Sequence, residues 1–120
     1  EWRNYTVSAA INLHLARAAG VAARVQGMRR YVALLLTNEG EAQLVRVCDG
    51  ETVLARTPFA WHYGATHSFT LSVNGARLQA SIDGQQLFDV EDAGSPLDGG
   101  GVALVCEEGR ISCEAVAVQG

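Results

Sequence analysis

Two short alternating runs joined by a tight turn constrain this chain more than any other feature. In residues 68–73, and again in 77–82, apolar side chains alternate strictly with polar ones. Successive side chains of a β-strand point to opposite faces, so each run predicts a strand with one buried and one solvated face. Asn74-Gly75 between them favours the positive φ angles of a type I′ hairpin turn, and Asp83-Gly84 repeats this signal. The stretch therefore predicts an antiparallel meander whose apolar face needs a second sheet to cover it.

Turn signals recur at intervals of about ten residues along the chain, a spacing typical of β-sandwiches. They separate ten predicted strands, at 2–13, 21–25, 30–37, 41–47, 52–56, 68–73, 77–82, 85–90, 102–106 and 111–118. We therefore predict an all-β fold, a two-sheet antiparallel β-sandwich of the jelly-roll type. Residues 31–36 are apolar on both faces, which indicates a central strand covered on both sides or lying beneath a ligand groove. We expect a loop at 13–19, and Pro58 is expected to end the fifth strand.

The length and charge of the chain limit the classes of partner. The 120 residues suit a single domain, 1–120, that buries roughly two-thirds of its unfolded surface. The net charge is −4 with no basic stripe, which argues against a nucleic-acid partner. No apolar run approaches the ~20 residues of a membrane helix, so no membrane partner is expected. The chain opens directly in a strand pattern without a signal peptide, and we expect a module excised from a larger protein.

The three cysteines, Cys48, Cys106 and Cys113, form an odd set without CxxC spacing. This pattern predicts neither a zinc site nor a disulfide framework. Reduced thiols in a cytoplasmic protein are the simplest interpretation. The alternative is one disulfide between Cys106 and Cys113, which flank a predicted turn.

Several segments follow one another in a familiar order. They are an aromatic-led first strand and residues 19–24, 26–31, 44–50, 70–75, 81–84 and 99–104, with an Asn-Gly hairpin, an Asp-Gly turn and a glycine-rich entry to a late strand. This order resembles the concanavalin A-like lectin/glucanase superfamily, and within it the laminin-G-like and pentraxin-like jelly rolls appended to bacterial hydrolases. The run 29–36 is also similar to the C-terminal sandwich of some bacterial ADP-ribosylglycohydrolases. The resemblance covers almost the whole chain and implies a concave sheet and rim loops able to bind glycans, sometimes with a calcium ion.

Sugars are held by aromatic faces and by planar polar groups that chelate hydroxyls. The candidate ligand-binding residues lie on an aromatic loop and on two neighbouring strands: Trp61, His62 and Tyr63, and Arg24, Arg30 and Tyr31. Each group has a structural alternative. The Trp61 ring could cap an edge of the sandwich, and an arginine on a half-buried sheet could pair with Asp49 or Asp83.

Calcium prefers six to eight oxygen ligands. Four acidic residues surround the glycine-rich loop and are the candidate ligands of a structural calcium ion: Asp89, Glu91, Asp92 and Asp98. They lack EF-hand spacing, and the alternative is a solvated acidic loop. No other cofactor is expected.

Catalysis is not predicted for this chain. The superfamily includes glucanases with paired glutamates, but Glu39 and Glu41 flank a turn glycine, which favours a solvated turn. We therefore predict a non-catalytic module that binds a glycan or a sugar-containing small molecule for the catalytic domain of a larger bacterial hydrolase. The alternative is a structural or self-association domain that packs on its parent enzyme.

Overall fold

The computed structural model describes the whole chain except residues 1–3, 16, 28, 63, 93–99, 108–109 and 120. The strands are β1 (Tyr5–Leu15), β2 (Ala18–Val25), β3 (Arg30–Thr37), β4 (Glu41–Cys48), β5 (Glu51–Pro58), β6 (Thr66–Asn74), β7 (Arg77–Ile82), β8 (Gln85–Glu91), β9 (Gly101–Glu107) and β10 (Arg110–Gln119). Within the described ranges, no helical segment is long and apolar enough to span a bilayer.

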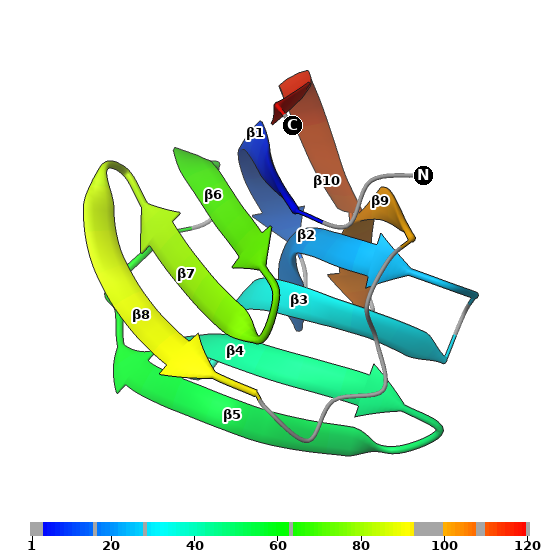
Figure 1. Cartoon of the computed structure of the whole chain (residues 1–120). Coiled ribbons are helices and arrows are strands. Elements are labelled where there is room, and N and C mark those ends of the chain that lie inside the picture. The colour runs from blue at the N-terminus through cyan, green and yellow to red at the C-terminus, as the bar shows by residue number, and fades with distance from the viewer. Residues whose placement is uncertain are drawn as a thin grey trace.

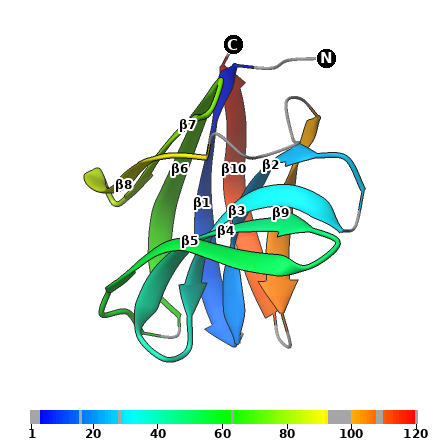
Figure 2. The same cartoon turned by 60° about the horizontal axis from the view of Figure 1, so that its bottom comes forward.

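The strands form two five-stranded antiparallel sheets that face each other. Sheet A has the order β10-β1-β6-β7-β8, and sheet B has the order β5-β4-β3-β2-β9. The meander of β6, β7 and β8 is visible at the left of Figure 1, above β4 and β5 of the other sheet. In Figure 2, β3, β4 and β5 curve as they pass in front of β1 and β10. The predicted fold class, an all-β two-sheet antiparallel sandwich, is confirmed.

The core lies between the sheets, where the alternating runs place their apolar side chains. In sheet A these include Phe69, Leu71, Leu78 and Ile82, all at most 1% exposed. They pack in one cluster with inward-facing residues of sheet B such as Leu34. The predicted buried faces of residues 68–73 and 77–82 are therefore the ones that the second sheet covers.

Several strand boundaries shift by a residue or two from the sequence prediction, and two places differ more. The loop expected at 13–19 is wrong: β1 continues to Leu15 and β2 begins at Ala18. Both extensions are paired, because Leu15 lies opposite Arg110 in β10 and Ala18 lies opposite Thr37 in β3. The fifth strand is longer than expected and includes Pro58, which is tolerated because β5 is an edge strand.

The two hairpins of the meander use different turns. At Asp83-Gly84 both φ angles are positive, 54° and 81°, as a type I′ turn requires. Asn74 instead pairs with Arg77 as the last residue of β6, so the loop is Gly75-Ala76. Only Gly75 has a positive φ there, 59°, the pattern of a type II′ turn. The type I′ prediction at Asn74-Gly75 is therefore wrong, although the hairpin itself is confirmed.

A buried hydroxyl links the two sheets at one end of the sandwich. The Tyr5 hydroxyl of β1 accepts a hydrogen bond from the Arg24 backbone N–H at 2.6 Å and donates to the Gly101 carbonyl at 3.1 Å. Arg24 has a positive φ of 53° and lies where the register between β2 and β9 shifts. The hydroxyl therefore satisfies backbone groups at the irregularity in β2 and at the start of β9.

Candidate ligand-binding face

The outer face of sheet B carries a second apolar cluster, separate from the core. Its buried members are small or aliphatic, and all are at most 5% exposed: Ala18, Ala22, Ala33, Leu35 and Val45. Partly buried residues pack around them, among them Tyr31 and Val105. The central strand β3 is thus apolar on both faces, as the run at 31–36 predicted. This face has two hollows, one near each end of β2.

The first hollow is polar and has a volume of about 230 Å³. It lies where β2 begins and β3 ends, and it is lined by Arg17, Ala18, Leu35, Thr37, Asn38, Glu39, Gln43 and Glu51. The backbone holds its rim together, because the Asn38 N–H donates to the Arg17 carbonyl at 2.8 Å. The Gln43 amide donates to Glu41 Oε1 at 3.2 Å, which orients the amide on β4.

The polar hollow combines two kinds of surface. A guanidinium, two amides and two carboxylates, from Arg17, Asn38, Gln43, Glu39 and Glu51, surround it, while Ala18 and Leu35 supply an apolar wall. Charged and amide groups form strong directional hydrogen bonds with hydroxyls, and an apolar wall matches C–H groups. This arrangement can hold a small polyhydroxylated molecule.

The second hollow is apolar and larger, about 510 Å³. It lies at the opposite end of β2, between β3 and the edge strand β9, and it is lined by Ala22, Val25, Gly27, Tyr31, Ala103, Leu104, Val105 and Cys106. Cys106 is an exposed free thiol, and Cys48 is also free. Among the candidate ligand residues that the structure describes, Tyr31 alone lines either of these two hollows.

The two predicted arginines lie away from both hollows. Arg24 is only 3% exposed, so its side chain is buried rather than presented on an open groove. Arg30 pairs with Asp49 at 3.4 Å, next to the turn that joins β4 and β5. The salt-bridge alternative therefore describes Arg30, with Asp49 as the partner, and neither arginine lines the two hollows.

The aromatic loop closes one end of the sandwich. The Trp61 indole donates to the Thr37 carbonyl at 2.7 Å, and its ring packs against the core. Loop residues Gly64 and Ala65 form backbone hydrogen bonds with Leu13. His62 is exposed, and Tyr63 lies outside the described residues. Trp61 thus has the capping role of the structural alternative.

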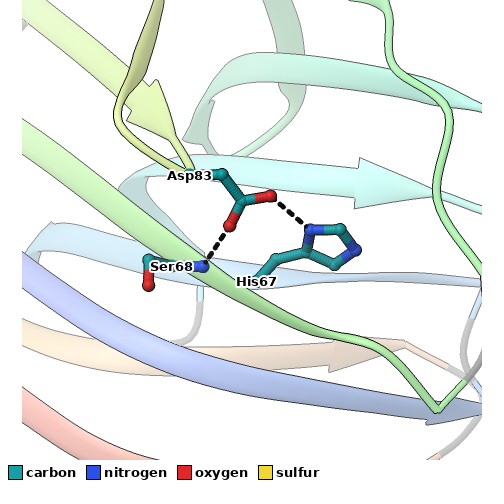
Figure 3. Close-up of polar contacts among 3 residues, drawn as sticks. All are labelled: His67, Ser68 and Asp83. Carbon is teal, nitrogen blue, oxygen red and sulfur yellow. Dashed lines mark hydrogen bonds and ion pairs between the residues drawn. The ribbon is translucent and has the colours of Figure 1, made fainter.

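A histidine–aspartate pair lies beside this loop (Figure 3). His67 Nδ1 is 2.7 Å from Asp83 Oδ2, and Asp83 Oδ1 accepts from the Ser68 N–H at 2.9 Å. Burial raises the pKa of Asp83, but the hydrogen bonds from His67 and Ser68 outweigh it and leave that pKa below its usual value. Figure 3 shows the Ser68 hydroxyl directed away from the imidazole. The pair therefore holds the β7–β8 turn against β6 and does not activate Ser68.

Of the four candidate calcium ligands, the structure describes Asp89, Glu91 and Asp92, and two of these carboxylates are paired with arginines. Asp89 receives two hydrogen bonds from Arg77, at 3.0 and 2.7 Å, and these hold the pKa of Asp89 below its usual value. Asp92 pairs with Arg46. Glu91 is exposed at the end of β8, and Asp98 lies outside the described residues. Across the described part of the chain, no three acidic, histidine or cysteine side chains group as metal ligands.

No protein-family model matches the chain, and no curated protein matches it by sequence. Solved structures with the same fold include a carbohydrate-binding module, galectins and a part of the GH43 protein BlXynB from Bacillus licheniformis. The carbohydrate-binding module CBM66 from Bacillus subtilis has a TM-score of 0.90 at 14% identity, over 99% of this chain and 76% of that one. Sheep galectin-11 in complex with glycerol has a TM-score of 0.69 at 14% identity, over 98% and 91%. Domain 4 of the Geobacillus stearothermophilus arabinanase AbnA, in complex with arabinotriose, has a TM-score of 0.71 at 12% identity, over 98% and 60%.

At these identities the likeness shows the fold alone. The expected two-sheet sandwich architecture is confirmed by the strand order and by this likeness.

The polar rim was not predicted from the sequence. The doubly apolar run marked the outer side of β3. Of the rim residues, only Glu39 was considered for a functional role, together with Glu41, and a solvated turn was favoured over that catalytic pair. Gln43 and Glu51 lie opposite Leu35 and Val47 in the sheet register, a relation that needs the strand pairing.

Proposed function

We propose that this protein is a non-catalytic carbohydrate-binding module whose sugar occupies the polar hollow. One observation carries the proposal: a hollow of about 230 Å³, lined by amide, carboxylate and guanidinium groups beside an apolar wall, opens on the outer face of a jelly-roll sheet. A monosaccharide unit presents the complementary pattern of hydroxyls and C–H groups.

The charges of the hollow favour a neutral sugar. Glu39 and Glu51 place two carboxylates around it against the single guanidinium of Arg17. An anionic sugar would meet excess like charge, which is unfavourable in a partly enclosed site. The arabinotriose and glycerol complexes of proteins with this fold, both neutral polyhydroxylated ligands, support the same class.

The wider setting that we propose is an accessory module of a larger bacterial hydrolase. The sequence resemblance to modules of bacterial hydrolases, including ADP-ribosylglycohydrolases, supports this. In such a protein the module would hold the attached catalytic domain near its sugar-containing substrate.

Calorimetric titration with a panel of neutral oligosaccharides, acidic oligosaccharides and ADP-ribose tests the proposal. We expect saturable binding of a neutral sugar. Gln43→Ala and Asn38→Ala should each weaken it roughly five- to tenfold, the effect of about one lost hydrogen bond. Gln86→Ala and Asn74→Ala, the same changes at exposed positions of sheet A, should leave affinity unchanged. A panel without binding, or equal losses in all four variants, would refute the assignment.

A structural or self-association domain is the second candidate function. The observation that favours it is a set of exposed apolar side chains on the edge strands β9 and β10: Val102 at 37%, Leu104 at 39% and Val116 at 48% exposed. Light scattering across a concentration series separates the two functions. A mass that rises with concentration in the wild type, but not in Val116→Asp, would support self-association. A constant monomer mass with saturable sugar binding would exclude it.

A further inference from the structure

We infer that the bound ligand is a sugar that carries an apolar substituent, with the sugar in the polar hollow and the alkyl or aryl substituent in the apolar hollow. This inference rests on the proposed function and names the class of ligand. The juxtaposition of the two hollows on one face of sheet B carries it.

The two hollows share one continuous apolar surface. Ala18 and Leu35 line the polar hollow, Ala22 and Tyr31 line the apolar one, and all four belong to the same cluster on the outer face of sheet B. Ala18 and Ala22 lie on the same face of β2, four residues apart, which corresponds to roughly 13 Å along a strand. A single extended ligand can therefore contact both hollows.

Between the two hollows the outward-facing positions of β2 are alanine and glycine, so no side chain of β2 protrudes there. Gly20 lies between Ala18 and Ala22 on β2, and a Cβ at Gly20 would come within 1.8 Å of the Leu34 carbonyl oxygen. Larger residues are therefore excluded at that point by the backbone of β3.

The second hollow is suited to an apolar group rather than to another sugar unit. The described residues that line it are all uncharged and mainly aliphatic, with the Tyr31 ring as one wall. Sugar hydroxyls placed there would lose water without gaining charged or amide partners, which is unfavourable. An alkyl or aryl group gains from leaving water, in proportion to its buried apolar area. At about 510 Å³, the hollow is also the larger of the two.

Affinity for glycosides of increasing chain length tests the inference. The probes are methyl, butyl and octyl β-glucopyranosides and β-galactopyranosides, each below its critical micelle concentration, with the phenyl glycosides as the aryl arm. We expect affinity to rise by up to about fourfold for each methylene that enters the hollow. The methyl glycoside should bind as weakly as the free sugar.

Matched variants locate the effect. Ala103→Asp and Val105→Asp place a carboxylate at the apolar hollow and should remove the gain from methyl to octyl, while binding of the methyl glycoside is retained. Val116→Asp makes the same kind of change on β10, outside the described lining, and should keep the full gain. Thermal unfolding of each variant confirms that it folds.

Each outcome decides the question. Equal affinity for methyl and octyl glycosides, or an octyl gain that persists in both acidic variants, would overturn the inference and leave the sugar site standing. Binding of a panel oligosaccharide but of neither glycoside series would also overturn the inference alone. Absence of binding in the panel and in both series would overturn the proposed function and this inference together.

Discussion

Removal of the Tyr5 hydroxyl should destabilise the protein more than removal of a comparable hydroxyl elsewhere on β1. The Tyr5 side chain is 4% exposed, and its hydroxyl accepts from the Arg24 N–H and donates to the Gly101 carbonyl. Tyr5→Phe keeps the ring in the core but removes these hydrogen bonds, together with the longer one to the Gly100 carbonyl at 3.4 Å. After the substitution, the Gly101 carbonyl can bond to water because Gly101 is exposed. The Arg24 N–H loses its partner in a buried position.

The magnitude follows from the buried donor. An unsatisfied buried backbone N–H costs about 1–3 kcal/mol. With an unfolding entropy of about 2.1 cal/mol/K per residue, 1 kcal/mol corresponds to roughly 4 °C for a chain of this length. We therefore expect Tyr5→Phe to lower Tm by roughly 4–12 °C. Thr6→Val removes a partly buried hydroxyl that bonds Ser72 across the outer face of sheet A at 2.8 Å, and it should cost less than about 0.5 kcal/mol.

Urea unfolding at pH 7 and above pH 10 provides the assay. Burial raises the pKa of Tyr5 above its usual value of 10.0, against smaller lowering effects of the Arg24 N–H and charge. Above pH 10 the unfolded tyrosine loses its proton before the folded one does, so the wild type should lose stability with rising pH more steeply than Tyr5→Phe. A substitution at an exposed site typically changes the free energy of unfolding by less than about 0.5 kcal/mol. A difference between the wild type and Tyr5→Phe of no more than this at pH 7 would refute the argument.

Three further outcomes are expected. Gly20→Ala should lower the free energy of unfolding by more than about 3 kcal/mol or prevent folding, because its Cβ would meet the Leu34 carbonyl oxygen at 1.8 Å. Urea unfolding measures this, and Gly50→Ala is the control because Gly50 has open space around it. Asp83→Asn should cost less than about 1 kcal/mol at pH 7, since the side chain is 45% exposed. Because the folded pKa of Asp83 is lowered, its contribution is present above the usual value of 3.8 and is lost as pH falls through the folded pKa, so the two proteins should converge at low pH. Finally, Tm should be the same in chelator and in millimolar calcium, because two of the proposed calcium ligands are paired with arginines; a calcium-dependent rise would contradict this.

Local patterns in the chain predicted the strands well because each signal acts over a few residues. The alternation in 68–73 and 77–82 specified which side chains face the core, and glycine-containing turns separated the strands. The turn at Asp83-Gly84 follows directly from two residues that tolerate positive φ. At Asn74 the same rule failed, because pairing with Arg77 across the hairpin moved the turn by one residue.

The candidate ligand residues show why site prediction was weaker than fold prediction. Trp61 and Arg24 have the chemistry of sugar-binding residues, but a composition pattern does not distinguish a ring that binds ligand from one that packs on a core. The indole of Trp61 found a backbone carbonyl at the end of β3, and Arg24 was buried at a register shift. Tyr31 packs on the outer face of sheet B, the side to which alternate residues of the apolar run 31–36 point.

The sequence by itself determined the number of strands, the faces that must leave water and the presence of a doubly apolar central strand, because these depend on neighbours along one segment. The tertiary structure decided which strands pair, and hence that Arg17, Asn38, Gln43 and Glu51 meet around one hollow while an apolar hollow forms at the other end of β2. Such sites join residues from separate strands, so only the register and curvature of the assembled sheet bring them together.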